Sequence, residues 1–288
     1  MNEKLKIVDC PRDAMQGISG RIPTDAKIDH LTQLLAVGFD TIDCGSFVSP
    51  KIIPQMADTA EVLSAVRSVE HDSLLSVIVA SEGGAERAMQ HDNVDLLGFP
   101  FSLSEQFQFD NTHKSREQAF ESIHHIQKSL EGTGKELLLY FSMAFGNPYQ
   151  DEWSVELVEE WAKRFADIGI QRINLSDTTS VAHVEDVERL FETLIPRYPE
   201  IEFGAHFHSA YDEWYPKVDA AYKSGCRRFD GAIKGFGGCP MAKNDMVGNT
   251  PTEKIITYAE KVKAVHGLNL FAFESAYNSA LKVMGLAR

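Results

Sequence analysis

The stretch Gly225-Cys-Arg-Arg-Phe-Asp230 follows a pattern of glycine, apolar residue, two variable residues, apolar residue and Asp or Asn. The same pattern recurs at Gly38-Phe-Asp-Thr-Ile-Asp43 and at Gly169-Ile-Gln-Arg-Ile-Asn174, each time after an amphipathic segment. A glycine in this place is typical of a helix C-cap, and the apolar residues after it are typical of a buried strand. Repeated joins of this kind predict strands that alternate with helices and pair in parallel.

Eight strands are predicted from such units, at residues 6–10, 41–44, 74–80, 95–99, 136–142, 172–176, 202–208 and 228–233. Eight strand–helix units in 288 residues favour a closed (β/α)8 TIM barrel, an α/β fold, over an open sheet. No Pro/Gly/Ser-rich linker divides the chain, so residues 1–288 are expected to form one catalytic domain. Residues 271–286 follow the eighth helix and predict an additional C-terminal helix on the barrel's flank.

The composition excludes several classes of partner. A net charge of -14 argues against nucleic acid and against an anionic membrane surface, because both attract basic proteins. No apolar run approaches the roughly 20 residues that cross a bilayer, and the N-terminus has no apolar signal core, so a cytoplasmic location is expected. The four cysteines are widely spaced, which argues against a zinc knuckle or a disulfide framework.

A TIM barrel carries its chemistry at the C-terminal ends of its strands. Polar residues gather at the C-terminal ends of several predicted strands, whereas the N-terminal ends carry fewer of them. We therefore expect one functional rim, built from Arg12, Asp13, Asp43, Asp177, His206 and His208.

The histidines of Phe203-Gly-Ala-His-Phe-His-Ser209 stand two apart in a predicted strand, so both imidazoles face the same way. Such a pair can bind a divalent metal if oxygen ligands arrive from elsewhere, although two ordinarily hydrogen-bonded histidines are the alternative. Asp13 and Asn249 can supply those oxygens. This ligand set suits Mg or Mn, with zinc less favoured, and leaves positions open for substrate.

Two further residues have candidate catalytic roles. Arg12 could stabilise a developing enolate oxygen, or it could simply pair with Asp13 or Asp43. Cys239 lies in a glycine-rich loop, where a thiol could act as an acid or base, although a free cysteine is more often a small buried residue. The remaining cysteines are interpreted as small residues in or next to strands: Cys10, Cys44 and Cys226.

Six motifs follow one another along nearly the whole chain: Pro11-Arg-Asp13, Ser46-Phe-Val-Ser-Pro-Lys51, Pro54-Gln-Met56, His206-x-His208, Gly237-Gly-Cys-Pro240 and Gly248-Asn249. Together they resemble those of one family, the 3-hydroxy-3-methylglutaryl-CoA lyases, which belong to the metal-dependent TIM-barrel lyases and aldolases. The Arg-Asp and His-x-His motifs are shared by the wider superfamily. The Ser-Phe-Val-Ser-Pro-Lys and Gly-Gly-Cys-Pro motifs are narrower and point to the lyase.

The resemblance implies a retro-Claisen cleavage of 3-hydroxy-3-methylglutaryl-CoA to acetoacetate and acetyl-CoA, a step of leucine degradation. Arg12 would contact the thioester oxygen, Asp43 stands where the family usually has glutamate, and His206 and Cys239 would move protons. The partner is a CoA thioester, and barrels of this type often form homo-oligomers. The implied ligands of Mg or Mn are Asp13, His206, His208 and Asn249.

Two segments depart from the family pattern: Ala14-Met-Gln-Gly-Ile18 after the Arg-Asp motif and Ser209-Ala-Tyr-Asp-Glu213 after the second histidine. Neither change removes a proposed metal ligand, but both alter the residues that shape the acyl pocket. A related metal-dependent aldolase or Claisen condensing enzyme acting on a 2-oxo or hydroxy acid therefore stays open. The alternative from a different class of function is a non-catalytic barrel that serves as a small-molecule binding or scaffold subunit.

Overall fold

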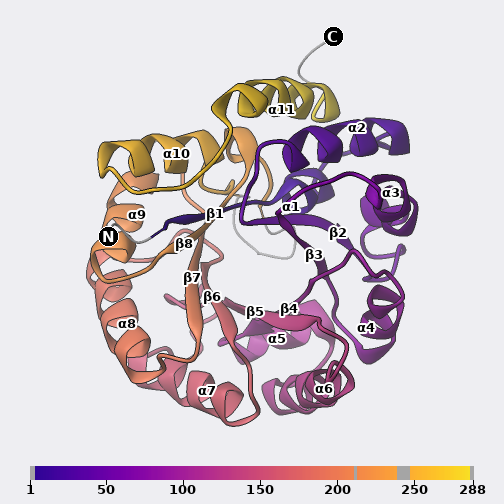
Figure 1. Ribbon diagram of the computed structural model, residues 1–288. Helices are drawn as coiled ribbons and strands as arrows, with labels where there is room; N and C mark the ends of the chain where they lie inside the picture. The colour runs from indigo at the N-terminus through magenta and orange to yellow at the C-terminus, as the bar shows by residue number, and fades with distance from the viewer. Residues whose placement is uncertain (1–3, 211–212, 239–246, 286–288) are drawn as a thin grey trace.

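The computed structural model describes residues 4–210, 213–238 and 247–285. Within these residues, eight parallel strands close into a barrel in chain order, with β8 paired back to β1 (Figure 1). The predicted TIM barrel is therefore confirmed. The strands are β1 (Lys6–Asp9), β2 (Thr41–Ser46), β3 (Leu74–Ile78), β4 (Leu96–Ser102), β5 (Glu136–Ser142), β6 (Arg172–Asp177), β7 (Glu202–Phe207) and β8 (Arg228–Gly231).

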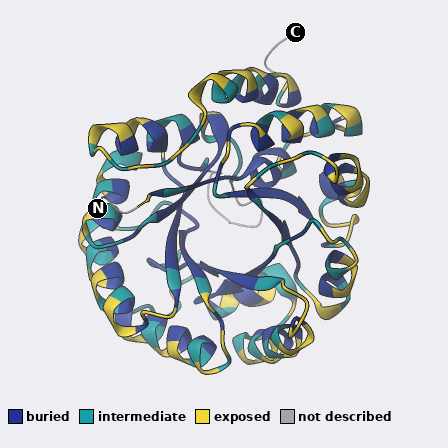
Figure 2. Cartoon of the chain, in the orientation of Figure 1, coloured by how far each residue is buried: buried dark blue, intermediate teal, exposed yellow. Residues whose placement is uncertain are grey.

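A ring of helices surrounds the barrel because each helix has one apolar face to bury. In α7, for example, Val158, Trp161 and Phe165 are buried at helical spacing. Figure 2 shows the buried strands inside and helices that are buried only on the side toward the strands. The ring consists of α2 (Thr24–Leu35), α3 (Thr59–Val66), α4 (Glu82–Met89), α6 (Arg116–Ser129), α7 (Val155–Asp167), α8 (Val184–Arg197), α9 (Trp214–Lys223) and α10 (Thr252–Lys261).

Shorter helical elements interrupt the connections that leave the strands. The short helix α1 follows β1, and α5 follows β4, so both lie on connections at the C-terminal ends of the strands. These are the connections at which a TIM barrel places its site. The elements are α1 (Pro11–Gln16), η1 (Pro54–Met56), α5 (Glu105–Thr112) and η2 (Ile233–Gly235).

The three glycines of the repeated pattern occupy the conformation that the sequence predicts. Gly38, Gly169 and Gly225 have φ values of +82°, +84° and +100°. Glycine adopts positive φ without the steric cost that a Cβ brings. The pattern therefore works as a helix stop followed directly by a buried strand.

The additional C-terminal helix is also confirmed, as α11 (Leu270–Val283), which packs on α2 at the barrel's flank (Figure 1). The buried His30 of α2 places Nδ1 at 2.5 Å from the Ser279 hydroxyl of α11. In the part of the chain described here, every helix is too short or too polar to span a membrane.

Strand limits differ from the prediction where a proline or a short helix intervenes. β4 continues through Pro100, which pairs in register with Tyr140, to Ser102. The predicted strand stopped before this proline because proline lacks the N–H that a ladder needs. The last strand, β8, ends at Gly231 and not at the predicted Ile233, which belongs to the short helix η2.

Candidate metal centre and active site

The predicted ligands Asp13, His206 and His208 come together at the C-terminal rim. One ligand atom from each lies within 4.8 Å of the other two, and all three residues are buried. Asp13 lies on α1, where Pro11 occupies the first turn and turns the chain into a helix directly after β1. His206 lies in β7 and His208 just beyond its end.

Both imidazoles have Nδ1 engaged, so that Nε2 is available for a metal. His206 Nδ1 lies 3.1 Å from Asp230 Oδ2, and His208 Nδ1 donates to the Val247 carbonyl at 3.0 Å. Metal-binding histidines characteristically bond a carboxylate or carbonyl through the second nitrogen, which fixes the tautomer and the ring orientation. This arrangement fits a metal centre better than the alternative, in which the two histidines make only ordinary hydrogen bonds.

Asn249, the fourth predicted ligand, lies against the same cluster. Its Nδ2 donates to Asp13 Oδ2 at 2.5 Å and to the Phe236 carbonyl at 2.9 Å. Its Oδ1 is buried and has no hydrogen-bond partner among the described residues. A buried amide oxygen without a partner is costly unless something binds it, so Asn249 fits the role of an oxygen ligand.

The charges of Asp13 and His208 also suit a cation. Burial raises the pKa of Asp13, but Arg12 and the two histidines outweigh burial, so the net shift is downward and the carboxylate stays ionised. Burial, followed by the charge of His206, lowers the pKa of His208 and keeps this imidazole neutral. An ionised carboxylate and a neutral imidazole are the forms that bind metals.

Arg12 is held in place by the two carboxylates that the sequence analysis considered. Its Nε and Nη2 donate to Asp43, the shortest distance being 2.5 Å to Oδ2, and Nη1 donates to Asp13 Oδ1 at 3.0 Å. Nη1 also donates to Gln16 Oε1 at 2.8 Å. Arg12 nevertheless lines the cavity, so the ion pair orients the guanidinium without removing it from the site.

A cavity of about 140 Å³ opens beside the metal cluster. Its lining includes Arg12, Asp13 and the two histidines together with several hydroxyl and amide side chains and a few apolar ones. The hydroxyl of Tyr140 is buried there without a hydrogen-bond partner among the described residues, and its ring meets His206 edge-on at 5.3 Å. The apolar and aromatic lining residues are Ile78, Pro100, Phe107 and Tyr140.

The chain matches the HMGL-like family model over residues 4–279. The chain belongs to the HMGL-like family. It is 31% identical over 255 residues to the cytoplasmic 3-hydroxy-3-methylglutaryl-CoA lyase of Rattus norvegicus, covering 88% of this chain and 74% of the relative. It is 28% identical to the 3-hydroxy-3-isohexenylglutaryl-CoA/hydroxy-methylglutaryl-CoA lyase of Pseudomonas aeruginosa, covering 98% and 94%.

A solved structure agrees with this assignment. The Acinetobacter baumannii 3-hydroxy-3-methylglutaryl-CoA lyase, in complex with coenzyme A and 3-methylmalate, superposes with a TM-score of 0.90 at 31% identity. The superposition covers 98% of this chain and 92% of the Acinetobacter chain. As a member of the HMGL-like family, the chain is a carbon–carbon lyase.

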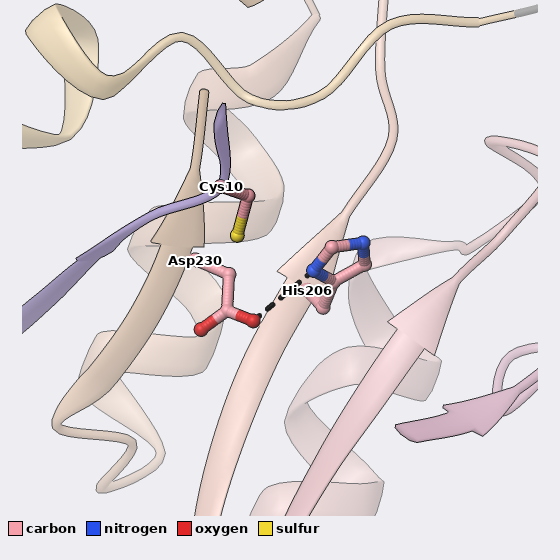
Figure 3. Close-up of side chains that lie close together, drawn as sticks. All are labelled: Cys10, His206 and Asp230. Carbon is pink, nitrogen blue, oxygen red and sulfur yellow. Dashed lines mark hydrogen bonds and ion pairs between the residues drawn. The ribbon is translucent and has the colours of Figure 1, made fainter. Parts of the chain in front are cut away.

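Sequence reasoning missed Asp230, which lies in this HMGL-like site and bonds His206 (Figure 3). Asp230 Oδ2 also accepts a bond from Asn174 Nδ2 at 2.6 Å. The signal was present in the repeated pattern, because Asp43, Asn174 and Asp230 all occupy its last position. All three are buried polar residues at equivalent places on β2, β6 and β8.

The four cysteines differ in their surroundings. Cys239, the proposed catalytic thiol, lies outside the described residues. Cys44 and Cys226 are fully inside the barrel wall, as expected of small buried residues. Cys10 is equally buried just after β1, but it lies beside His206 and Asp230, a proximity that its place in the sequence did not indicate.

Proposed function

We propose that this protein cleaves 3-hydroxy-3-methylglutaryl-CoA to acetoacetate and acetyl-CoA. The observation that carries the proposal is the buried group of Asp13, His206, His208 and Asn249 beside Arg12, in a chain of the HMGL-like family. A CoA thioester as substrate is supported by the coenzyme A in the Acinetobacter baumannii lyase. The whole barrel would then act as one catalytic domain.

Asp13, His206, His208 and Asn249 would hold a divalent cation through two nitrogens and two oxygens. This donor set suits Mg or Mn, which accept mixed nitrogen and oxygen ligands and keep positions open for substrate. When bound, such a cation would supply the Lewis acidity that makes the substrate's 3-hydroxyl easier to deprotonate.

The reaction needs one proton to leave the 3-hydroxyl and another to arrive at C2. Loss of the hydroxyl proton lets the C2–C3 bond break, giving a ketone at C3 and the enolate of acetyl-CoA, which is then protonated at C2. His206 is proposed to move the first proton. Burial lowers its pKa, but Asp230 stabilises the charged form and outweighs burial, so the net shift is upward. Cys239 is proposed as the acid that protonates the enolate.

Arg12 would stabilise the enolate oxygen. Its charge is permanent in this setting, because burial is outweighed by Asp43 and Asp13, which raise its pKa. The bonds to Asp43 fix the guanidinium plane before substrate arrives, so little reorganisation is needed as negative charge develops. Asp43 is therefore proposed to act through Arg12.

Location, oligomeric state and pathway are proposed from the relatives and from the fold. A cytoplasmic location is supported by the cytoplasmic lyase of Rattus norvegicus. Membership of a homo-oligomer and a place in leucine degradation stay predictions. A related aldolase or condensing reaction on a 2-oxo or hydroxy acid is the alternative that the first experiment addresses.

The deciding experiment is acetyl-CoA release from 3-hydroxy-3-methylglutaryl-CoA, with and without added Mg or Mn. The unaltered protein is compared with His208→Ala, and His125→Ala, a half-exposed histidine outside the site, serves as the matched control. Metal-dependent release that is lost only in His208→Ala supports the proposal. Metal binding without any release would refute this substrate and favour the aldolase alternative.

A further inference from the structure

A second group of metal-binding side chains lies next to the first and shares His206 with it. Cys10, His206 and Asp230 each offer one ligand atom within 4.8 Å of the other two (Figure 3). All three are buried, with exposed fractions of 0%, 7% and 2%. The group thus combines sulfur, nitrogen and oxygen donors inside the barrel.

Barrel closure holds this group rigidly. His206 of β7 is directly in register with Asp230 of β8, and the Cys10 N–H donates to the Gly231 carbonyl of β8 at 2.8 Å. His206 and Asp230 therefore come from adjacent strands and Cys10 from the residue that follows β1, and all three backbones are fixed by hydrogen bonds. Sites built on strands keep their geometry better than sites built on loops.

Two potential metal-ligand atoms of the group make no hydrogen bond to the described residues. Asp230 Oδ1 is buried and has no hydrogen-bond partner there. The buried thiols of Cys44 and Cys226 donate to backbone carbonyls, at 3.4 Å to Ser76 and 3.2 Å to Arg228, whereas no such bond is formed by the Cys10 thiol. A buried carboxylate oxygen without a partner carries a desolvation cost that a cation would remove.

The electrostatic surroundings of Cys10 are negative. The thiol lies within electrostatic reach of four carboxyl groups, those of Asp230, Asp43, Asp13 and Asp9. Carboxylates that disfavour a thiolate favour a cation at the same place, and a bound dication stabilises the thiolate directly. The surroundings of the thiol thus complement positive charge.

We propose that Cys10, His206 and Asp230 form a second cation site that takes a thiophilic ion such as zinc or cadmium. Three protein ligands of mixed sulfur, nitrogen and oxygen type suit zinc, because a thiolate is a soft ligand that magnesium and manganese do not favour. In the metal-free protein, His206 would serve this site through Nδ1, giving up its hydrogen bond to Asp230 as the Nδ1 proton moves to Nε2. The thiol proton leaves to solvent as the ion binds.

Cadmium titration of the metal-free protein tests this site, because a thiolate–cadmium bond gives a charge-transfer absorption in the ultraviolet. The titration is repeated in Cys239→Ser, which removes the loop thiol, and in Cys10→Ser and Cys44→Ser made on that background. Cys44 is the matched control because it is also a buried thiol of the barrel wall. The absorption is expected to survive Cys239→Ser and Cys44→Ser and to vanish in Cys10→Ser.

Two more variants keep the test decisive if Cys10→Ser folds poorly. Asp230→Asn retains the thiol and should weaken cadmium binding about 10–100-fold. His208→Ala disrupts the first cluster alone, so the thiolate–cadmium absorption should persist. Absorption that never appears, survives in Cys10→Ser or is lost in His208→Ala overturns the proposal, as does unchanged affinity in Asp230→Asn. The readout uses no CoA thioester, so it is independent of the proposed lyase reaction.

Discussion

His206 Nδ1 lies 3.1 Å from Asp230 Oδ2, the same oxygen that accepts a bond from Asn174 Nδ2 at 2.6 Å. Asp230 therefore joins the metal cluster to the interior of the barrel. A carboxylate behind a metal-binding histidine orients the ring and makes Nε2 a better ligand.

Replacing Asp230 with asparagine should weaken manganese binding about 10–100-fold, because the His206 ring loses its charged partner. Manganese affinity, measured by electron paramagnetic resonance of the free ion, checks this expectation. Asp167→Asn, a change in an exposed ion pair, should leave the affinity unaltered. Equal affinities in both variants would show that Asp230 does not position His206.

Replacing Arg12 with glutamine should lower kcat for acetyl-CoA release about 10²–10³-fold, since the positive charge near the developing enolate is lost. Arg67→Gln, which breaks an exposed pair with Asp92, is the control and should keep normal turnover. Steady-state kinetics at saturating metal separate kcat from KM. A change confined to KM would assign Arg12 to substrate binding alone.

Gly204→Ala should disturb the support of Asp230. A Cβ at Gly204 would lie 2.2 Å from Asn174 Oδ1 and 3.1 Å from Arg228 Cδ, so the Asn174 side chain, which bonds Asp230, must shift. Overpacking of this kind costs about 1–3 kcal/mol, which urea unfolding would measure. The control Gly83→Ala lies on α4, where the nearest atom is the flexible end of Arg87, and should be neutral or slightly stabilising. Unchanged stability in Gly204→Ala would mean that the barrel interior yields more easily than its contacts indicate.

Stability should fall on acidification because of His30 at the α2–α11 interface. Burial lowers the pKa of His30 from 6.5 to about 4, so the folded state holds the neutral imidazole. The unfolded chain takes up a proton first, and the stabilisation present above pH 6.5 is lost as the pH falls toward about 4. The loss amounts to roughly 3 kcal/mol.

Urea unfolding between pH 4 and 7 measures this dependence. His30→Gln should reduce the pH dependence of the free energy of unfolding. His266 lies outside this interface, so His266→Gln should leave that dependence unchanged. An equally steep slope in His30→Gln would place the acid sensitivity in other groups.

The sequence by itself determined the barrel, because glycine stops and buried apolar runs recur at local spacing and need no knowledge of distant contacts. It also predicted which polar side chains meet, since Asp13, His206, His208 and Asn249 lie at or after strand ends that must share a rim. What only the tertiary structure decided is the contact network behind them. Arg12 meets Asp43 only because β1 lies beside β2, and Cys10 meets Asp230 and His206 only because β8 closes onto β1. These contacts depend on which strands become neighbours when the barrel closes, and the pattern within one short segment does not say which distant side chains its residues will meet.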